Sequence, residues 1–281
     1  MNSIVDGEHK PISEPLGRCV APGIEVGAPL FDAGTYDSNT PIDIDFTEKN
    51  NADICPKLQL PTANDENIPN KKKAEYKWDA SYLAVKYMEQ LNNSSIEIPA
   101  CLTQIYYRAL IHVYNSQGTC RDIVVNRYEI HGRGRTYIKG LELLVNCKEK
   151  WFQQWKKGEK QTSHNDIDKL IKKYELSIYD LVKTTTSCNL LLLASRPINT
   201  YSLGRRFSEI EGINKAIFVI YGDGNQINAE FTQEKVIIEY VLGFGDCPSG
   251  CMYSYRTRFE VDKRGRVKVI GIYGTEPNQK R

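Results

Sequence analysis

Apolar residues recur at helical spacing in two neighbouring segments, one after residue 78 and one after residue 99. In both segments the period of 3.6 residues places the apolar side chains on one helix face. Asp79 is placed to cap the first helix and Pro99 to begin the second. The pattern predicts a pair of amphipathic helices within residues 76–138, followed by a strand at 123–130, all packed on the rest of the protein. The two stripes are Ala80, Leu83, Ala84, Tyr87, Met88, Leu91 and Leu102, Ile105, Tyr106, Ala109, Leu110, Val113.

The middle of the chain changes between helical and strand periods in an informative order. Strands are predicted at 139–147, 177–182, 189–195 and 215–221, with helices at 148–156, after Asn165, and from Asn199 or Thr200 to Gly212. The resulting order, β-α-β-β-α-β, is typical of the ferredoxin-like split. Residues 139–221 are therefore predicted to form an α+β unit with helices on one face of a four-stranded antiparallel sheet. Eight of its residues are predicted to be deeply buried: Leu143, Val145, Leu191, Leu193, Leu203, Phe207, Ile217 and Val219.

The last sixty residues alternate apolar and polar positions between turn signals. Strands are predicted at 226–231, 236–242, 252–261 and 266–273, and they read as an antiparallel meander spanning residues 222–274. We expect these hairpins to extend the sheet of the preceding unit. Residues 275–281 are predicted to be a frayed tail.

Residues 1–75 show no period and are rich in Pro, Gly, Asn and Asp. Residues 1–70 carry twelve acids and four bases, a net charge of −8, whereas residues 71–281 carry 23 acids and 33 bases, a net charge of +10. Such a composition predicts a disordered acidic arm. The arm is either a solvated tether or a screen for a basic surface that binds a polyanion. Because no Lys/Arg run exceeds Lys71–Lys73, specific nucleic-acid binding is not indicated.

Nothing in the sequence resembles a transmembrane segment or a secretory leader. Apolar runs such as Leu190–Ala194 are far too short for a membrane span. The first ten residues lack a basic patch followed by an apolar stretch. A removed leader and a cytoplasmic origin both remain open at this point.

Eight cysteines give an even count that suits disulfides. Cys247 and Cys251 enclose Pro248 and Gly250, and this C-P-S-G-C spacing predicts a local disulfide. It is neither the spacing of a redox motif nor that of a zinc knuckle. The bond either serves only as a structural staple or shapes a recognition loop, in which case Asp246 and Ser249 are its available polar groups.

His131 lies in the Gly/Arg-rich stretch HGRGRT. With Arg133 and Arg135 it could bind a phosphate or carboxylate through two guanidinium groups and loop amides. The alternative is a mobile hairpin tip.

Other candidate sites carry weaker signals. Asp166 and Asp168 follow His164, but the start of a helix attracts such residues for capping alone. Asp223 and Asn225 lack the remaining ligands of a calcium loop. No metal site, cofactor fingerprint, phosphate loop or nucleophile elbow is predicted.

Two of these motifs carry resemblances to known families. GDGNQI at 222–227, followed by GFGDCPSGC at 243–251, is similar to an uncharacterised group of secreted bacterial proteins with a GDGN…GWGDCPSGC-like motif. That resemblance implies an extracellular or envelope setting. The stretch IEGINKA at 210–216 resembles subtilisin-type propeptides, which implies a ferredoxin-like chaperone or inhibitor of a peptidase.

Two classes of function follow. One is a non-catalytic secreted or envelope protein that binds another protein, in the manner of a peptidase inhibitor. The other is a hydrolase whose site assembles only in three dimensions. A deep pocket with two ionisable groups in hydrogen-bond reach would favour the enzyme. A flat or convex sheet face with exposed aromatic side chains would favour the binding protein.

Overall fold

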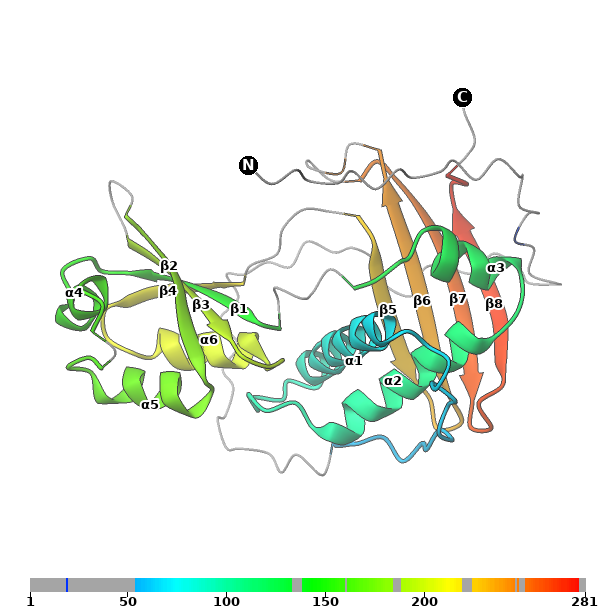
Figure 1. The fold of residues 1–281 in the computed structure, drawn as a ribbon, viewed down its shortest axis with the longest axis horizontal. Coiled ribbons are helices and arrows are strands. Elements are labelled where there is room, and N and C mark those ends of the chain that lie inside the picture. Colours follow the sequence, from blue (N-terminus) through cyan, green and yellow to red (C-terminus); the bar gives the residue numbers. More distant parts are fainter. Residues whose placement is uncertain are drawn as a thin grey trace.

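The protein has an α+β architecture with two separate four-stranded antiparallel sheets, seen in a computed structural model (Figure 1). One sheet, here called sheet A, carries three of the helices. The other, sheet B, is covered by the two long helices that precede sheet A in the chain. The structure describes residues 19, 54–132, 138–159, 161–183, 188–218, 224–245, 247 and 251–277.

The two predicted N-terminal helices are present, but the first is longer than the sequence predicts. α1 spans Asn70–Gln90 and α2 spans Ala100–Asn115, and they pack against each other. Asp79 therefore lies inside α1 and is not its N-cap. The predicted arm also extends too far, because residues 54–68 pack on the core through Ile54, Leu58, Leu60 and Ile68. These four apolar residues follow no period, so a polar composition hid them. Residues 1–18 and 20–53 lie outside the described residues.

The strand predicted at 123–130 is wrong, because this segment is helical. α3 (Thr119–Arg121) continues into a π-helical turn, η2, at Asp122–Arg127. The β-branched run Ile123–Val125 suggested a strand. However, Val124 and Val125 are both buried, at 0% and 3% exposure. Consecutive residues of a strand point to opposite faces, so a helical turn explains this burial better than a strand with one face in the core.

Sheet A contains the strand and helix order that the sequence predicts for the middle of the chain. Its strands run β2-β3-β1-β4, and every neighbouring pair is antiparallel. The side chain of Asn199 caps α6 by accepting a hydrogen bond of 3.1 Å from the amide of Ser202. The elements are β1 (Gly140–Val145), α4 (Lys150–Lys156), α5 (Asn165–Lys173), β2 (Leu176–Lys183), β3 (Cys188–Ala194), α6 (Thr200–Ser208) and β4 (Ile213–Phe218).

The buried side of β3 is the opposite of the predicted one. Burial alternates along this strand, and Leu190 and Leu192 face the core while Leu191 and Leu193 are only half-buried. Ile217 is half-buried as well, and Val219 lies outside the described residues. Four consecutive leucines carry no alternation, so the sequence could not show which face is inside. The other four predictions place Leu143, Val145, Leu203 and Phe207 in the core, where all four are fully buried.

The C-terminal strands form a sheet of their own and do not extend sheet A, contrary to the prediction. They follow one another as β5-β6-β7-β8, and each neighbouring pair is antiparallel. Their inner face packs on α1 and α2, with Ile238, Tyr240, Phe259 and Val261 in one cluster with the helices. The helix pair supplies the apolar cover that sheet B needs. The strands are β5 (Gln226–Phe231), β6 (Lys235–Phe244), β7 (Tyr253–Asp262) and β8 (Val267–Gly274).

The loop between α1 and α2 fastens the two halves together. Ile96 is buried in the core of sheet A, and its carbonyl accepts a hydrogen bond of 2.9 Å from the amide of Asn199. Arg196 donates two hydrogen bonds to Glu97, at 2.6 and 2.8 Å. These bonds hold the pKa of Glu97 below its usual range. The start of α6 is thus bound to a loop about a hundred residues earlier in the chain.

All eight cysteines lie within the described residues, and all eight pair. Cys247 and Cys251 pair as the spacing predicts, with their Cα atoms 4.0 Å apart. The other three bonds join Cys19 to Cys120, Cys55 to Cys101 and Cys147 to Cys188. The first two tie the N-terminal segment to the helices, and the third ties β1 to β3.

Candidate functional site

His131 is the one member of the predicted anion site that the structure describes, and it lies between two carboxylates of α1. Its Nδ1 is 2.6 Å from Oδ2 of Asp79, and its Nε2 is 3.3 Å from Oε2 of Glu75. The other oxygen of Asp79 accepts a hydrogen bond of 2.9 Å from the amide of Gly132. Arg133 and Arg135, which are predicted to act with His131, lie outside the described residues.

This cluster packs beside two tyrosine rings, of which Tyr76 is buried. The ring of Tyr76 lies 5.4 Å from that of His131 and 5.7 Å from that of Tyr114. Burial, together with the charge of Asp79, raises the pKa of the Tyr76 hydroxyl. Within the described chain, both ring nitrogens of His131 face carboxylates, and neither faces a hydroxyl or a thiol. The arrangement therefore holds residues 128–132 against α1. Among the described residues it provides no nucleophile for the histidine to activate.

The disulfide-closed connection between β6 and β7 is built by close packing of the two glycine-rich motifs. A Cβ on Gly243 would lie 2.6 Å from Sγ of Cys251 and 2.8 Å from Cα of Gly224. Gly224 and Gly243, which are far apart in sequence, thus meet at one end of sheet B. Phe244 and Tyr253 stack beside this junction, with ring centroids 5.6 Å apart. Asp246 and Ser249 lie outside the described residues.

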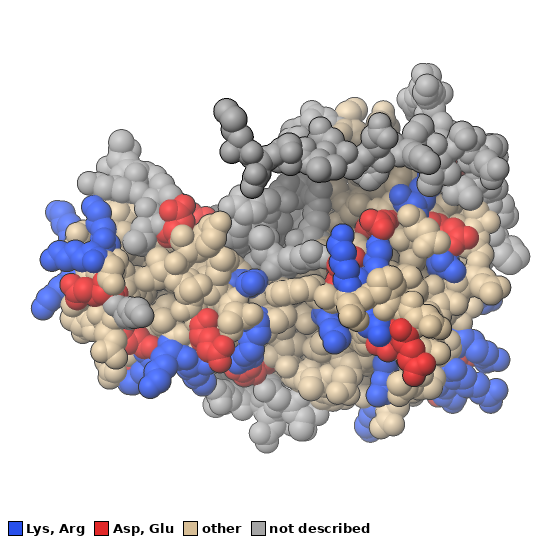
Figure 2. Space-filling model, viewed as in Figure 1, with Lys and Arg blue, Asp and Glu red and all other residues tan. Residues whose placement is uncertain are grey.

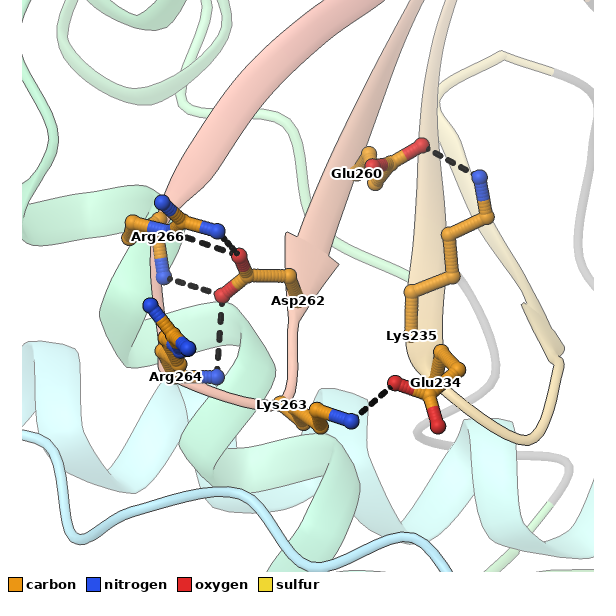
Figure 3. A pocket seen from close by; sticks show the side chains of 7 residues that line it. All are labelled: Glu234, Lys235, Glu260, Asp262, Lys263, Arg264 and Arg266. Carbon is orange, nitrogen blue, oxygen red and sulfur yellow. Dashed lines mark hydrogen bonds and ion pairs between the residues drawn. The ribbon is translucent and has the colours of Figure 1, made fainter.

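The hollow in Figure 3 is lined only by charged side chains of two hairpin turns. Its volume is about 370 Å³, and its seven residues come from the β5–β6 and β7–β8 ends of sheet B. Lys235 binds Glu260 at 2.6 Å, Arg266 binds Asp262 at 2.6 Å, and Lys263 pairs with Glu234. Six of the seven charges thus neutralise one another. Because the three ion pairs are partly or fully exposed, we interpret them as interactions that stabilise the two turns. We do not interpret the hollow as a catalytic pocket.

A second hollow, of about 470 Å³, is a mostly apolar groove between α1 and α2. It is lined by Trp78 and Tyr107 and bordered by Pro197 of the loop before α6. The Tyr107 hydroxyl donates a hydrogen bond of 2.7 Å to Asp65. This bond fixes the aromatic side chain on the outer surface of the helix pair, but no convergent set of ionisable groups accompanies it.

The helix-free face of sheet A carries an unexpected apolar surface. The name denotes the side of the sheet bearing Leu144, Leu191, Leu193 and Ile217, opposite the core against which α4, α5 and α6 pack (Figure 1). Leu191 lies directly across from Glu142 of β1, and Glu142 lies across from Ile217 of β4. None of these apolar side chains belongs to either core cluster of the described chain.

Polar residues alternate with the apolar ones on this face. Asn189 and Lys215 lie across from Leu144, Asp180 lies across from Leu191, and Ser177 lies across from Leu193. Asn189 donates a hydrogen bond of 2.6 Å to Glu142, which holds that carboxylate in the middle of the apolar residues. At the edge of the sheet, Ile178 and Tyr179 of β2 are 37% and 70% exposed. A bulge in the pairing between β2 and β3 accompanies them. Ile178 lies across from the buried Leu192, on the helix side of the sheet, so it does not extend the helix-free face.

Charge on the visible side of the molecule is mixed. Lys and Arg side chains form several clusters, each beside acidic side chains, and no single basic stripe runs across this view (Figure 2). Within the described residues, no group of three or more His, Cys, Asp or Glu is arranged to hold a metal ion. No described helix is long and apolar enough to cross a membrane.

Comparison with known proteins gives no further assignment. No protein-family model matches the chain, and no significant match was found among curated proteins or solved structures. The site must therefore be judged on its own geometry.

Proposed function

We propose that this protein is a non-catalytic, extracytoplasmic module that binds another protein through the helix-free face of sheet A. The observation that carries the proposal is the half-exposure of Leu144, Leu191, Leu193 and Ile217 on one flat surface. Apolar side chains that are exposed together on one sheet face mark a candidate interaction site. Burying it against a partner would remove about 25 cal/mol of unfavourable hydration per Å².

The fold supports the peptidase-inhibitor version of this proposal. Sheet A has the order β2-β3-β1-β4 with helices on one face, and this order supports the proposal of a ferredoxin-like split. In such a unit the helix-free side is the surface left for a partner. A serine peptidase of the subtilisin type is therefore the first partner to test.

The eight paired cysteines support an extracytoplasmic setting. Four disulfides persist in oxidising compartments and are rare in the reducing cytosol. They also leave no thiol to act as a nucleophile, which weighs against one class of hydrolase.

The proposal is tested by placing charge on the apolar face. The variant carrying Leu191→Lys and Leu193→Lys removes the centre of the patch without touching the core. The control is Leu91→Lys, which adds one of the same two positive charges at a leucine that is 41% exposed and lies just after α1. Circular dichroism and thermal unfolding should show all three proteins folded.

Binding is then read in two ways. Titration of a subtilisin-type peptidase should show inhibition by the wild type and the control, and at least a tenfold weaker effect with the double variant. In the native host, a photo-crosslinking residue at position 191 should capture a partner that one at position 91 does not. Equal crosslinking from both positions, or full crosslinking after Leu193→Lys, would overturn the assignment of this face.

A further inference from the structure

Three side chains form a continuous hydrogen-bonded chain where α1 passes beside β5, an edge strand of sheet B (Figure 1). Lys86 of α1 donates a hydrogen bond of 3.0 Å from Nζ to Oδ1 of Asn228 on β5. The amide nitrogen of Asn228 donates a hydrogen bond of 3.1 Å to Oε2 of Glu239 on β6. An amine, a carboxamide and a carboxylate from three different elements are therefore in direct contact, in this order.

The surroundings of these three groups favour a neutral amine on Lys86. Glu239 is 0% exposed and Asn228 is 8% exposed, and the lysine Nζ lies 5.4 Å from the centre of the Tyr82 ring. Burial lowers the pKa of the Lys86 ammonium group, although the charges of Glu89 and Glu239 act in the opposite direction. A lysine with a lowered pKa is more often neutral than a solvated one, and the neutral amine is the nucleophile.

The amine also lies close to a carbon that it can attack. Cγ of Asn228 is one C=O bond, about 1.23 Å, from the oxygen that Lys86 contacts, so Nζ lies no more than about 4.2 Å from this carbon. Reacting atoms in a productive arrangement are about 3–3.5 Å apart. A small rotation within the flexible lysine side chain would close this difference while the helix and the strand stay in place.

Glu239 supplies the acid–base group that such an attack requires. Its Oε2 contacts the amide nitrogen of Asn228, which is the leaving group. Within the described residues its other oxygen, Oε1, is buried without a hydrogen-bond partner. Nη1 of Arg256 stands 3.9 Å from Oε2, which is too long for a hydrogen bond. The carboxylate thus keeps the capacity to take up a proton beside the leaving group.

We propose that Lys86 and Asn228 become joined by an isopeptide bond in a reaction that the chain's own Glu239 catalyses. The neutral amine of Lys86 attacks Cγ of Asn228, and a C–N bond forms. Glu239 accepts a proton from the attacking nitrogen and returns it to Nδ2 of Asn228. The bond between Cγ and Nδ2 then breaks, ammonia leaves, and a secondary amide remains. The reaction balances without an oxidant or any other reactant.

Burial is a requirement of this reaction and not an obstacle to it, because both reacting groups belong to the chain and nothing has to enter from solvent. The bond would join α1 to β5 across 142 positions of the sequence. Unlike the four disulfides, it would survive a reducing agent and would keep the helix attached to sheet B. The three residues belong to sheet B and its covering helix, so the proposal does not depend on the helix-free face of sheet A.

The test is mass spectrometry of the reduced full chain. The intact mass should be lower than the mass of the sequence by one molecule of ammonia. Trypsin does not cleave after a linked lysine, so the digest should contain peptide 78–108 joined to peptide 216–235.

Two variants separate the proposed chemistry from the packing. Glu239→Gln keeps both reacting groups and removes the proton carrier, so the bond should form at least about tenfold more slowly. Glu230→Gln makes the same change on β5 at a glutamate that is 32% exposed, and it should link as the wild type does. Circular dichroism establishes that both variants are folded.

Three results would overturn the proposal. A wild-type mass equal to that of the sequence, with peptides 78–86 and 216–235 recovered separately, would show that the three groups are only hydrogen-bonded. A loss of ammonia that maps to other residues would exclude Lys86 and Asn228. Equally fast linkage in Glu239→Gln and Glu230→Gln would exclude Glu239 as the catalytic residue. If Glu239→Gln does not fold, the wild-type peptide map alone decides.

Discussion

Leu190 and Leu191 are adjacent on β3 yet lie in opposite environments. Leu190 is fully buried in the core of sheet A, and Leu191 is half-buried on the helix-free face. We predict that Leu190→Ala lowers the free energy of unfolding by about 2–5 kcal/mol, because it leaves a cavity. Leu191→Ala should cost less than about 1 kcal/mol, since less apolar area is lost from a half-exposed position. Chemical denaturation of both variants measures the difference, and equal losses would contradict the assigned faces.

The link between the two halves predicts a pH dependence. The Arg196 hydrogen bonds lower the pKa of Glu97, so the folded state holds this proton less tightly than the unfolded chain does. The stabilising contribution is present above the unfolded pKa and is lost as the pH falls through the folded value. Glu97→Gln should therefore flatten part of the fall in melting temperature on the acid side, below about pH 4.5, the usual pKa of a glutamate. Lys169→Gln, on exposed α5, should leave the acid limb unchanged.

The disulfides should differ in their contribution to stability according to the length of chain they close. In the chain-entropy model a loop of five residues contributes about 2 kcal/mol and one of a hundred residues about 4.7 kcal/mol. Replacing Cys247 and Cys251 with serine should therefore lower the melting temperature less than replacing Cys19 and Cys120. Calorimetry of the two double variants makes the comparison. A larger loss from the short bond would show that the glycine junction beside Gly243 and Gly224 depends on it.

As long as its amine is unlinked, the partly buried Lys86 predicts a change in stability at alkaline pH. Burial lowers the pKa of this ammonium group, so between the folded and unfolded values the unfolded chain binds more protons. Stability should therefore rise with pH through the folded pKa of Lys86 and level off near its usual value of 10.5. Lys86→Met should remove this rise. The comparison requires unfolding curves between about pH 8 and pH 10.5, and an unchanged slope would contradict it.

How far the sequence predicts this protein depends on how periodic each segment is. The stripes of α1 and α2 and the alternation of β7 identified those elements because one face of each is buried. The leucines of β3 carry no alternation, so the sequence predicts the wrong face to be buried. The β-branched run at 123–125 carries no usable period either, so the sequence predicts a strand where the structure has a helical turn. Residues 54–68 were missed because four scattered apolar residues do not form a pattern.

The candidate surfaces depend on contacts between distant segments, which a single sequence does not show. The helix-free face needs β1, β3 and β4 in register. The sequence does mark Glu239 of β6 as unusual, because it is a single glutamate inside the apolar run VIIEYVL at 236–242. Its partners Asn228 and Arg258 could be identified only from the pairing of the strands.

The bond between Cys19 and Cys120 also determines how the N-terminal segment can leave the protein. A peptide bond hydrolysed anywhere between residues 20 and 53 leaves the upstream piece covalently attached to α3 through this disulfide. Mass spectrometry of a nicked sample should show that piece only after a reducing agent is added. Release of a fragment that contains Cys19 therefore requires two independent chemical events, a hydrolysis and a reduction, and an oxidising compartment permits only the first.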